Sequence, residues 1–164
     1  MIAYKFLRDD GTGVFTRFAW PLPEDGGPGE WVHAPIVTCH SGIHACRVSD
    51  LPLWLGRELY EIELADRIVE ERTKVVASRG RLVRRIDAWD DATRAAYARD
   101  CADRAHGLAA GMPDWEMAVE PAAAGGPASI GFIAARIAEA RDGIEAYRAE
   151  RARQVDWLAQ RLGV

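Results

Sequence analysis

The first 87 residues alternate apolar and polar positions at the spacing of β-strands. Ile2 to Arg8 and Val14 to Phe18 are apolar runs separated by Asp9 to Gly13, and the Asp and Gly residues between them favour a β-hairpin. The clearest alternation lies in Arg57 to Ala65, which we expect to be a half-buried strand. One face of that strand carries Tyr60, Ile62 and Leu64, and the other carries Leu59, Glu61 and Glu63.

Two shorter strands and a short helix are predicted between these runs. Trp31 to Val37 and Ile43 to Arg47 are expected to be strands on either side of the turn Cys39 to Gly42. Ser49 to Gly56 begins with capping residues, has a proline in its first turn and closes on glycine, which predicts a short helix.

A second hairpin is predicted further along the chain. Thr73 to Ala77 and Arg81 to Ile86 are rich in β-branched and apolar residues, and Ser78 to Gly80 between them has the composition of a turn. The strand-rich part is expected to end near Asp87.

Helical spacing replaces the alternation from Asp90 onward. Tyr97, Cys101, Ala105 and Leu108 gather on one face of a helix. Gly111 to Pro127 contains three prolines and three glycines and predicts a flexible loop. Two amphipathic helices, 128–141 and 144–162, follow as an antiparallel pair.

These patterns predict an α+β fold in a single domain, 1–164. Its N-terminal half, residues 1–87, is expected to be an antiparallel, β-rich half with one short helix. Its C-terminal half, residues 88–164, is expected to consist of helices packed on that sheet, with the flexible loop 111–127 among them.

Composition narrows the class of protein. The chain has 164 residues, 49% of them apolar, and a net charge of -4, which is typical of an ordinary globular protein. It contains no apolar run long enough to span a membrane and no secretory leader, so a cytoplasmic protein without a membrane partner is expected. The acidic total also argues against a nucleic-acid partner, although Arg79, Arg81, Arg84 and Arg85 form a local basic cluster.

The turn between the two short strands gathers reactive side chains. Cys39, His40, His44 and Cys46 offer two sulfur and two nitrogen donors within eight residues, a set that zinc can bind tetrahedrally. A structural zinc held by Cys39, His44 and Cys46 is therefore one hypothesis. The alternative interpretation treats Cys46 as a small buried residue and His44 as a hydrogen-bonded residue without a metal.

The same turn also suggests catalysis. A cysteine with a nearby histidine could act as a nucleophile, and Glu61 with Glu63 could do acid–base work if their environments differ. By analogy with small ADP-ribosyltransferase-like folds, a transferase would use His44 with Glu61 or Glu63. The alternative interpretation of the two glutamates is a solvated outer face.

Three segments carry a resemblance to a known group of proteins. Tyr4-Lys5, the turn Cys39 to Cys46 and the strand Leu59 to Leu64 resemble a family of bacterial and phage proteins. That family has a Cys-x-Ser-Gly-aliphatic-or-aromatic-His-Ala-Cys turn followed by a strand similar to Tyr-Glu-Ile-Glu-Leu. The resemblance covers residues 1–87 and implies a shared fold, but it implies no activity.

The sequence favours a binding module over an enzyme or a zinc domain. Its ligand, a small molecule or a protein, would contact the surface around the turn, and no cofactor can be named. The expected contacts are Tyr4, Trp31, Ser41 and Cys46.

Overall fold

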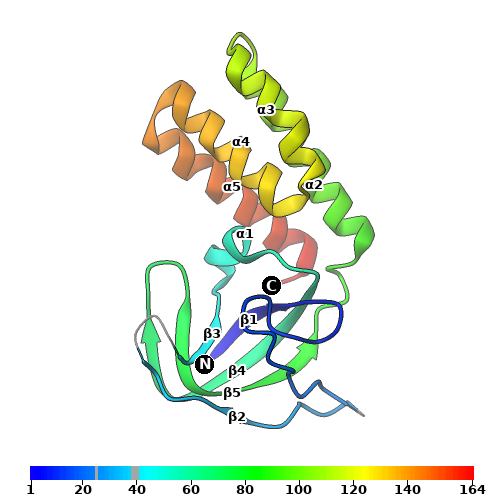
Figure 1. The fold of residues 1–164 in the computed structure, drawn as a ribbon, viewed down its shortest axis with the longest axis vertical. Coiled ribbons are helices and arrows are strands. Elements are labelled where there is room, and N and C mark those ends of the chain that lie inside the picture. Colours follow the sequence, from blue (N-terminus) through cyan, green and yellow to red (C-terminus); the bar gives the residue numbers. More distant parts are fainter. Residues whose placement is uncertain (25, 38–40) are drawn as a thin grey trace. The chain divides into compact units, whose positions relative to one another are not determined.

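The computed structural model describes residues 1–24, 26–37 and 41–164, which form two compact units (Figure 1). Unit 1 is Met1–Trp89 and contains strands with one short helix, whereas unit 2 is Asp90–Val164 and contains helices. The α+β fold class, with an antiparallel sheet in the N-terminal half, is confirmed. The packing of the helices on the sheet and the single domain stay predictions.

The sheet of unit 1 is antiparallel and has β4 and β5 at its centre. β4 (Glu58–Glu70) pairs with β5 (Val75–Arg85), and β1 (Ile2–Leu7) pairs with the other edge of β4. β2 (Val32–His33) and β3 (Ile43–Ala45) follow one another along the remaining edge of β5. The predicted strand from Trp31 to Val37 is therefore reduced to two residues.

The sheet closes on itself where β1 meets the end of β3. Tyr4 and Cys46 exchange both backbone hydrogen bonds, each 2.8 Å between nitrogen and oxygen. Strands β1, β4, β5 and β3 therefore form a ring of paired neighbours. Their shared apolar cluster is the core of the unit and includes Ala3, Leu7, Ile43, Ala45, Tyr60, Ile62, Leu64, Val75, Ala77 and Leu82.

The predicted short helix is present as a 3-10 turn, η1 (Val48–Asp50), followed by α1 (Leu51–Trp54). The guanidinium of Arg47 lies 2.7 Å from the carboxylate of Asp50 and closes the first turn. Pro52 occupies the start of α1, where its missing N–H removes no helical hydrogen bond. The helix ends at Trp54, whose indole N–H donates to the carbonyl of Thr73 at 2.6 Å.

The first predicted hairpin is wrong. β1 pairs with β4. In the segment predicted as the second strand, Val14 to Thr16 form a turn, and Arg17 and Phe18 belong to no strand. The physical reason is local, because the carboxylate of Asp10 accepts hydrogen bonds from the amide and hydroxyl of Thr12 and tightens the reversal. The apolar residues after this turn remain on the surface, and Phe15 is 80% exposed.

The second predicted hairpin is also wrong, because β5 continues through Gly80. The chain reverses before β5, where the amide of Glu71 donates to the carbonyl of Lys74 at 2.9 Å. Gly80 serves close packing and not a turn. A Cβ at this position would lie 3.1 Å from Ile43 Cγ2 and 3.2 Å from Leu64 Cδ2.

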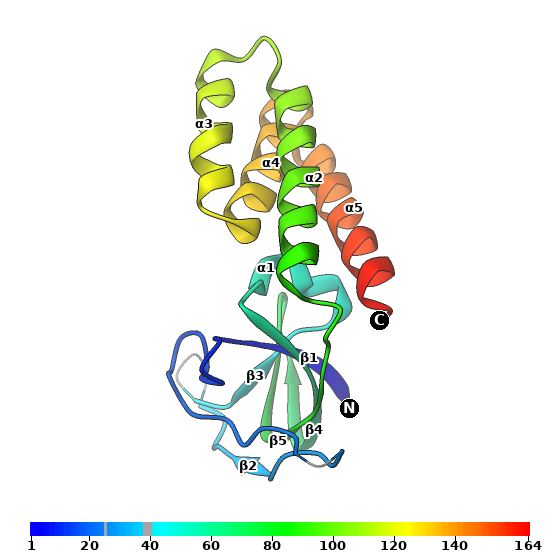
Figure 2. The same ribbon diagram turned by 90° about the vertical axis from the view of Figure 1, so that its right-hand side faces the viewer.

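Unit 2 contains four helices in the part of the chain that the structure describes (Figure 2). They are α2 (Asp91–Ala109), α3 (Pro113–Ala124), α4 (Pro127–Asp142) and α5 (Ile144–Leu162). Tyr97, Cys101 and Ala105 are buried as predicted, and Ala109 takes the place expected for Leu108. No helix among the described residues has the length and apolar character needed to cross a bilayer.

The flexible loop predicted for residues 111–127 is wrong, because most of it forms α3. Pro113 occupies the first turn, where proline suits a helix, and alanines favour the helix that follows. Pro121 lies in the last turn and removes only one backbone hydrogen bond there. Proline at these positions is compatible with a helix, so the number of prolines alone does not predict a loop here.

Candidate ligand-binding site

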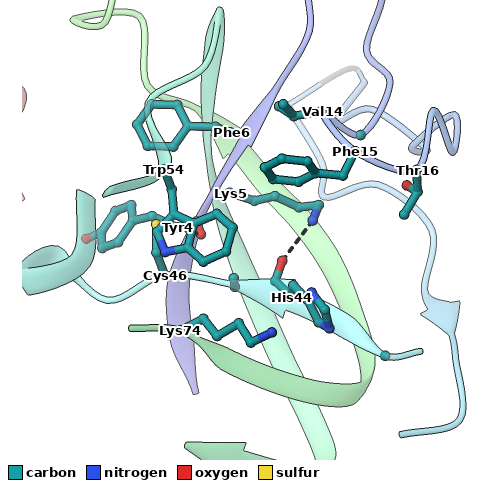
Figure 3. Close-up of a pocket in the computed structure, with 13 residues that line it drawn as sticks. Tyr4, Lys5, Phe6, Val14, Phe15, Thr16, His44, Cys46, Trp54 and Lys74 are labelled. Atoms are coloured by element: carbon teal, nitrogen blue, oxygen red, sulfur yellow. Dashed lines mark hydrogen bonds between the residues drawn. The ribbon is translucent and has the colours of Figure 1, made fainter. Parts of the chain in front are cut away.

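A cavity of about 140 Å³ lies in unit 1 where residues 13–16, β1, β3 and α1 come together (Figure 3). Figure 3 shows cationic and aromatic side chains around this space. The lining residues are Tyr4, Lys5, Phe6, Gly13, Val14, Phe15, Thr16, Gly42, His44, Ala45, Cys46, Trp54 and Lys74.

The cavity lies where β1 and β3 stop pairing with one another. In an antiparallel pair, alternate residues exchange backbone hydrogen bonds. After Tyr4 and Cys46, the next residues in position to pair are therefore Phe6 on β1 and His44 on β3. The carbonyl of His44 accepts a hydrogen bond from the ammonium group of Lys5 at 2.8 Å instead of from a backbone amide. A side chain from β1 thus bridges the opening between the two strands.

Lys5 places a positive charge at the inner end of the cavity. Its ammonium group lies 4.7 Å from the centre of the Trp20 ring, and it forms no ion pair with the residues that the structure describes. Burial lowers the pKa of this amine from 10.5 to about 8, and the nearby thiol of Cys46 opposes that change. Lys5 is therefore a desolvated cation without a carboxylate partner among these residues.

Lys74 adds a second cationic side chain to the lining of the cavity, and His44 adds an imidazole. The pKa of His44 is lowered by burial first, and then by the charges of Lys74 and Lys5, while Glu71 acts in the opposite direction. The ammonium group of Lys74 lies 3.3 Å from the carboxylate of Glu71. His44 is thus held in its neutral form at pH 7.

Aromatic rings form the other side of the cavity. Phe15 and Trp54 meet edge to face, with ring centres 6.0 Å apart and planes at 87°. The hydrogen bond from the indole of Trp54 to Thr73 fixes the orientation of that ring. Phe15 remains largely exposed, so a bound apolar group would bury area that water now covers.

Gly42 is required beside this cavity for steric reasons. Its φ of +129° is a conformation that other residues rarely adopt. A Cβ would also lie 2.5 Å from Val76 Cγ1, inside van der Waals contact. The glycine in the Ser41-Gly42 turn therefore allows β3 to approach β5.

Cys46 lines the cavity, but its surroundings disfavour the negatively charged thiolate that a nucleophilic cysteine needs. It is 1% exposed, and its thiol donates to the carbonyl of Tyr4 at 3.3 Å. Burial, followed by the charge of Asp50, raises its pKa to about 12. The thiolate form that a nucleophilic cysteine needs is therefore disfavoured near neutral pH.

The two glutamates predicted to be catalytic do not line the cavity that His44 lines. Glu61 forms an ion pair with Arg84 at 2.9 Å, and Glu63 forms one with Arg81 at 2.8 Å. Both pairs cross between β4 and β5. The structure therefore does not bring His44 and these carboxylates together in one cavity.

Of the four predicted ligand contacts, Tyr4 and Cys46 line the cavity, whereas Trp31 and Ser41 do not. Trp31 stacks with the guanidinium groups of Arg79 and Arg81, at 4.0 and 4.5 Å from its ring. The hydroxyl of Ser41 donates to the carbonyl of Pro35 at 2.6 Å, so it stabilises the turn.

The zinc hypothesis depends on a residue outside the described part of the chain. Cys39, together with His40, lies in the gap between residues 37 and 41. Within the described ranges, no three His, Cys, Asp or Glu side chains are grouped closely enough to bind a metal ion.

The arginines of the basic cluster on β5 form ion pairs with carboxylates of unit 1. Arg81 and Arg84 pair with Glu63 and Glu61, and Arg85 lies 3.2 Å from Glu58. Arg79 lies 3.8 Å from Asp66. These arginines belong to cross-strand ion pairs that cover the sheet.

The sequence interpretation missed Lys5, Phe15, Trp54 and Lys74 as cavity residues. One signal could have indicated the lysines. The chain has 19 arginines and only two lysines, and both lysines line this cavity. No comparable signal marks Phe15, because its contact with Trp54 depends on the folding of the preceding turn.

No family model, curated protein or solved structure matches this chain. The family resemblance therefore stays a prediction, and function has to be inferred from the chemistry of the cavity.

Proposed function

We propose that unit 1 is a binding module for small organic anions that carry an aromatic or other apolar part. One observation carries the proposal. Lys5 and Lys74 line a cavity whose described lining residues include no Asp or Glu, although the chain has a net charge of -4. Lys74 forms an ion pair with Glu71, which does not line the cavity, whereas Lys5 has no carboxylate partner among the described residues.

A bound anion would stabilise the desolvated ammonium group of Lys5. The ammonium group is desolvated, and its protein acceptor is a neutral backbone carbonyl. A carboxylate, sulfonate or phosphate in the cavity would form a charge-assisted hydrogen bond with it, which is stronger than a bond between neutral groups. Ligand binding would therefore recover part of the free energy that burial of this charge costs.

The aromatic side of the cavity adds an apolar requirement. A ring placed beside Phe15 and Trp54 would make edge or stacked contacts and cover the exposed face of Phe15. The cavity volume of about 140 Å³ favours a ring-sized group over a protein segment. These features support a small-molecule ligand in preference to a protein partner.

The test compares two fluorescent probes of similar shape. 8-Anilinonaphthalene-1-sulfonate is an aromatic anion, and N-phenyl-1-naphthylamine lacks its charge. We expect the sulfonate to bind more tightly to the wild type, and Lys5→Met to weaken its binding by roughly 10- to 100-fold, the usual range for a lost charged hydrogen bond. Binding of the uncharged probe should change little.

Arg84→Met provides the matched control, because it removes a cation that pairs with Glu61 and does not line the cavity. This variant should bind the sulfonate as the wild type does. Equal affinity for both probes, unchanged in Lys5→Met, would contradict the proposed function. Circular dichroism of each variant establishes that it is folded.

A further inference from the structure

We propose that the amine of Lys5 forms an imine with an aldehyde or ketone group of the anionic ligand. This inference rests on the proposed function and specifies its ligand class as anionic carbonyl compounds. Unit 1 would then hold its ligand through a reversible covalent bond at β1.

The position of Lys5 suits a nucleophilic amine. It lines the cavity, is held by the pairing of β1 with β4, and has only the carbonyl of His44 and the ring of Trp20 as close partners among the described residues. The lowered pKa, caused by burial, agrees with this geometry because it increases the fraction of free amine near neutral pH. Desolvation in an apolar site is a known way to activate lysine.

Lys74 suits a different role. It is ion-paired with Glu71, and it contributes positive charge to the same cavity. The ammonium form of Lys5 would bind the anionic group directly. When the neutral amine of Lys5 reacts with the carbonyl carbon, the anionic group would lie toward Lys74. The other basic side chains of the chain, apart from its histidines, are arginines, which do not form imines of this kind.

The reaction balances without an oxidant or a reductant. The lone pair of the neutral amine forms a C–N bond to the carbonyl carbon, and the carbonyl oxygen takes up a proton to give a carbinolamine. Nitrogen gives up one of its two protons when the carbinolamine forms, and the other when the hydroxyl takes up a proton and leaves as water, so that a C=N bond results. The neutral imidazole of His44, which lines the same cavity, could accept a proton from nitrogen and return it to the leaving hydroxyl.

The experiment uses the full chain with 4-formylbenzoate, an aromatic carboxylate that carries an aldehyde. Sodium cyanoborohydride reduces any imine to a stable secondary amine, which peptide mass spectrometry assigns to Lys5, Lys74 or the α-amine. We expect Lys5 to be labelled at least roughly tenfold faster than the other two amines near neutral pH, because the cavity would hold the ligand beside Lys5. 4-Methylbenzoate, which lacks the aldehyde, should slow the labelling by competition.

Lys5→Arg separates the covalent step from anion binding. This variant keeps a cation at position 5, so both benzoates should still displace the naphthalene sulfonate, but the adduct at position 5 should be absent. Labelling of the wild type that favours Lys74 or the α-amine, while 4-methylbenzoate still displaces the sulfonate, would overturn the imine and leave the proposed function standing. Failure of both benzoates to displace the sulfonate, with no adduct on Lys5, would overturn the choice of ligand class as well.

Discussion

Lys5 lies on β1 between Ala3 and Leu7, which both belong to the apolar core. Strand alternation therefore places its aliphatic stem on the core side of the sheet, and the stem carries the ammonium group to the cavity. An apolar residue would pack at this position without any loss of hydration. A lysine here is costly for stability, and this cost is expected where a residue serves binding.

The loss of stability that results from burying the charge of Lys5 should become smaller as the pH rises. Its pKa is about 8 in the folded protein and 10.5 ordinarily, so between these values the unfolded chain binds more protons than the folded chain. The free energy of unfolding of the wild type, relative to Lys5→Met, should thus rise by up to about 1.4 kcal/mol per pH unit above pH 8. Urea unfolding of both proteins from about pH 7 to about pH 9.5 measures this difference.

Comparison of the two proteins removes the opposing contribution of Cys46. Its pKa is raised to about 12 by burial, so this thiol lowers the stability of both proteins as the pH rises above 9.0. The contribution cancels to first order in the difference. A wild-type-minus-variant difference that stays constant with pH would show that Lys5 is not desolvated.

At the scale of elements, β5 depends on the absence of a side chain at Gly80. Gly80→Ala would place a Cβ 3.1 to 3.3 Å from Ile43 Cγ2, Leu64 Cδ2 and the carbonyl oxygen of Glu63. The strands would have to move apart, so we expect the free energy of unfolding to fall by about 1 to 3 kcal/mol. Denaturant unfolding of unit 1, followed by tryptophan fluorescence, measures the loss.

Gly27→Ala is the matched control for this prediction. Among the described residues, a Cβ at Gly27 would have only the carbonyl oxygen of Glu24 within 4 Å, at 3.6 Å, which is ordinary contact. Its effect on stability should stay within about 0.5 kcal/mol. Equal stability of the two variants would contradict the close packing of β3, β4 and β5 around Gly80.

The predictions made from sequence succeeded where the local pattern decides the element. Arg57 to Ala65 alternates cleanly, and all of it except Arg57 lies within β4. The helices expected at 128–141 and 144–162 appear as α4 and α5. The predictions failed where pairing with another strand decides the structure of a segment. Ser78 to Gly80 has the composition of a turn, but pairing of Arg79 and Gly80 with β2 and β4 holds this segment in an extended strand.

At the scale of the whole molecule, all described lining residues of the cavity come from unit 1. Residues 1–89 alone should therefore fold and bind 8-anilinonaphthalene-1-sulfonate with an affinity within about threefold of that of the full chain. Circular dichroism and a fluorescence titration check this expectation. An unfolded fragment, or a much weaker affinity, would show that unit 2 is needed to form the site.

The sequence by itself determined the fold class and the change from strands to helices near residue 90. These features follow from local periodicity and turn chemistry, which neighbouring residues decide. It did not determine which strands pair or that Lys5, Phe15, Trp54 and Lys74 share one cavity. Tertiary structure decided both, because strand pairing and the convergence of distant side chains depend on closing the sheet between Tyr4 and Cys46, a long-range contact that no local pattern specifies.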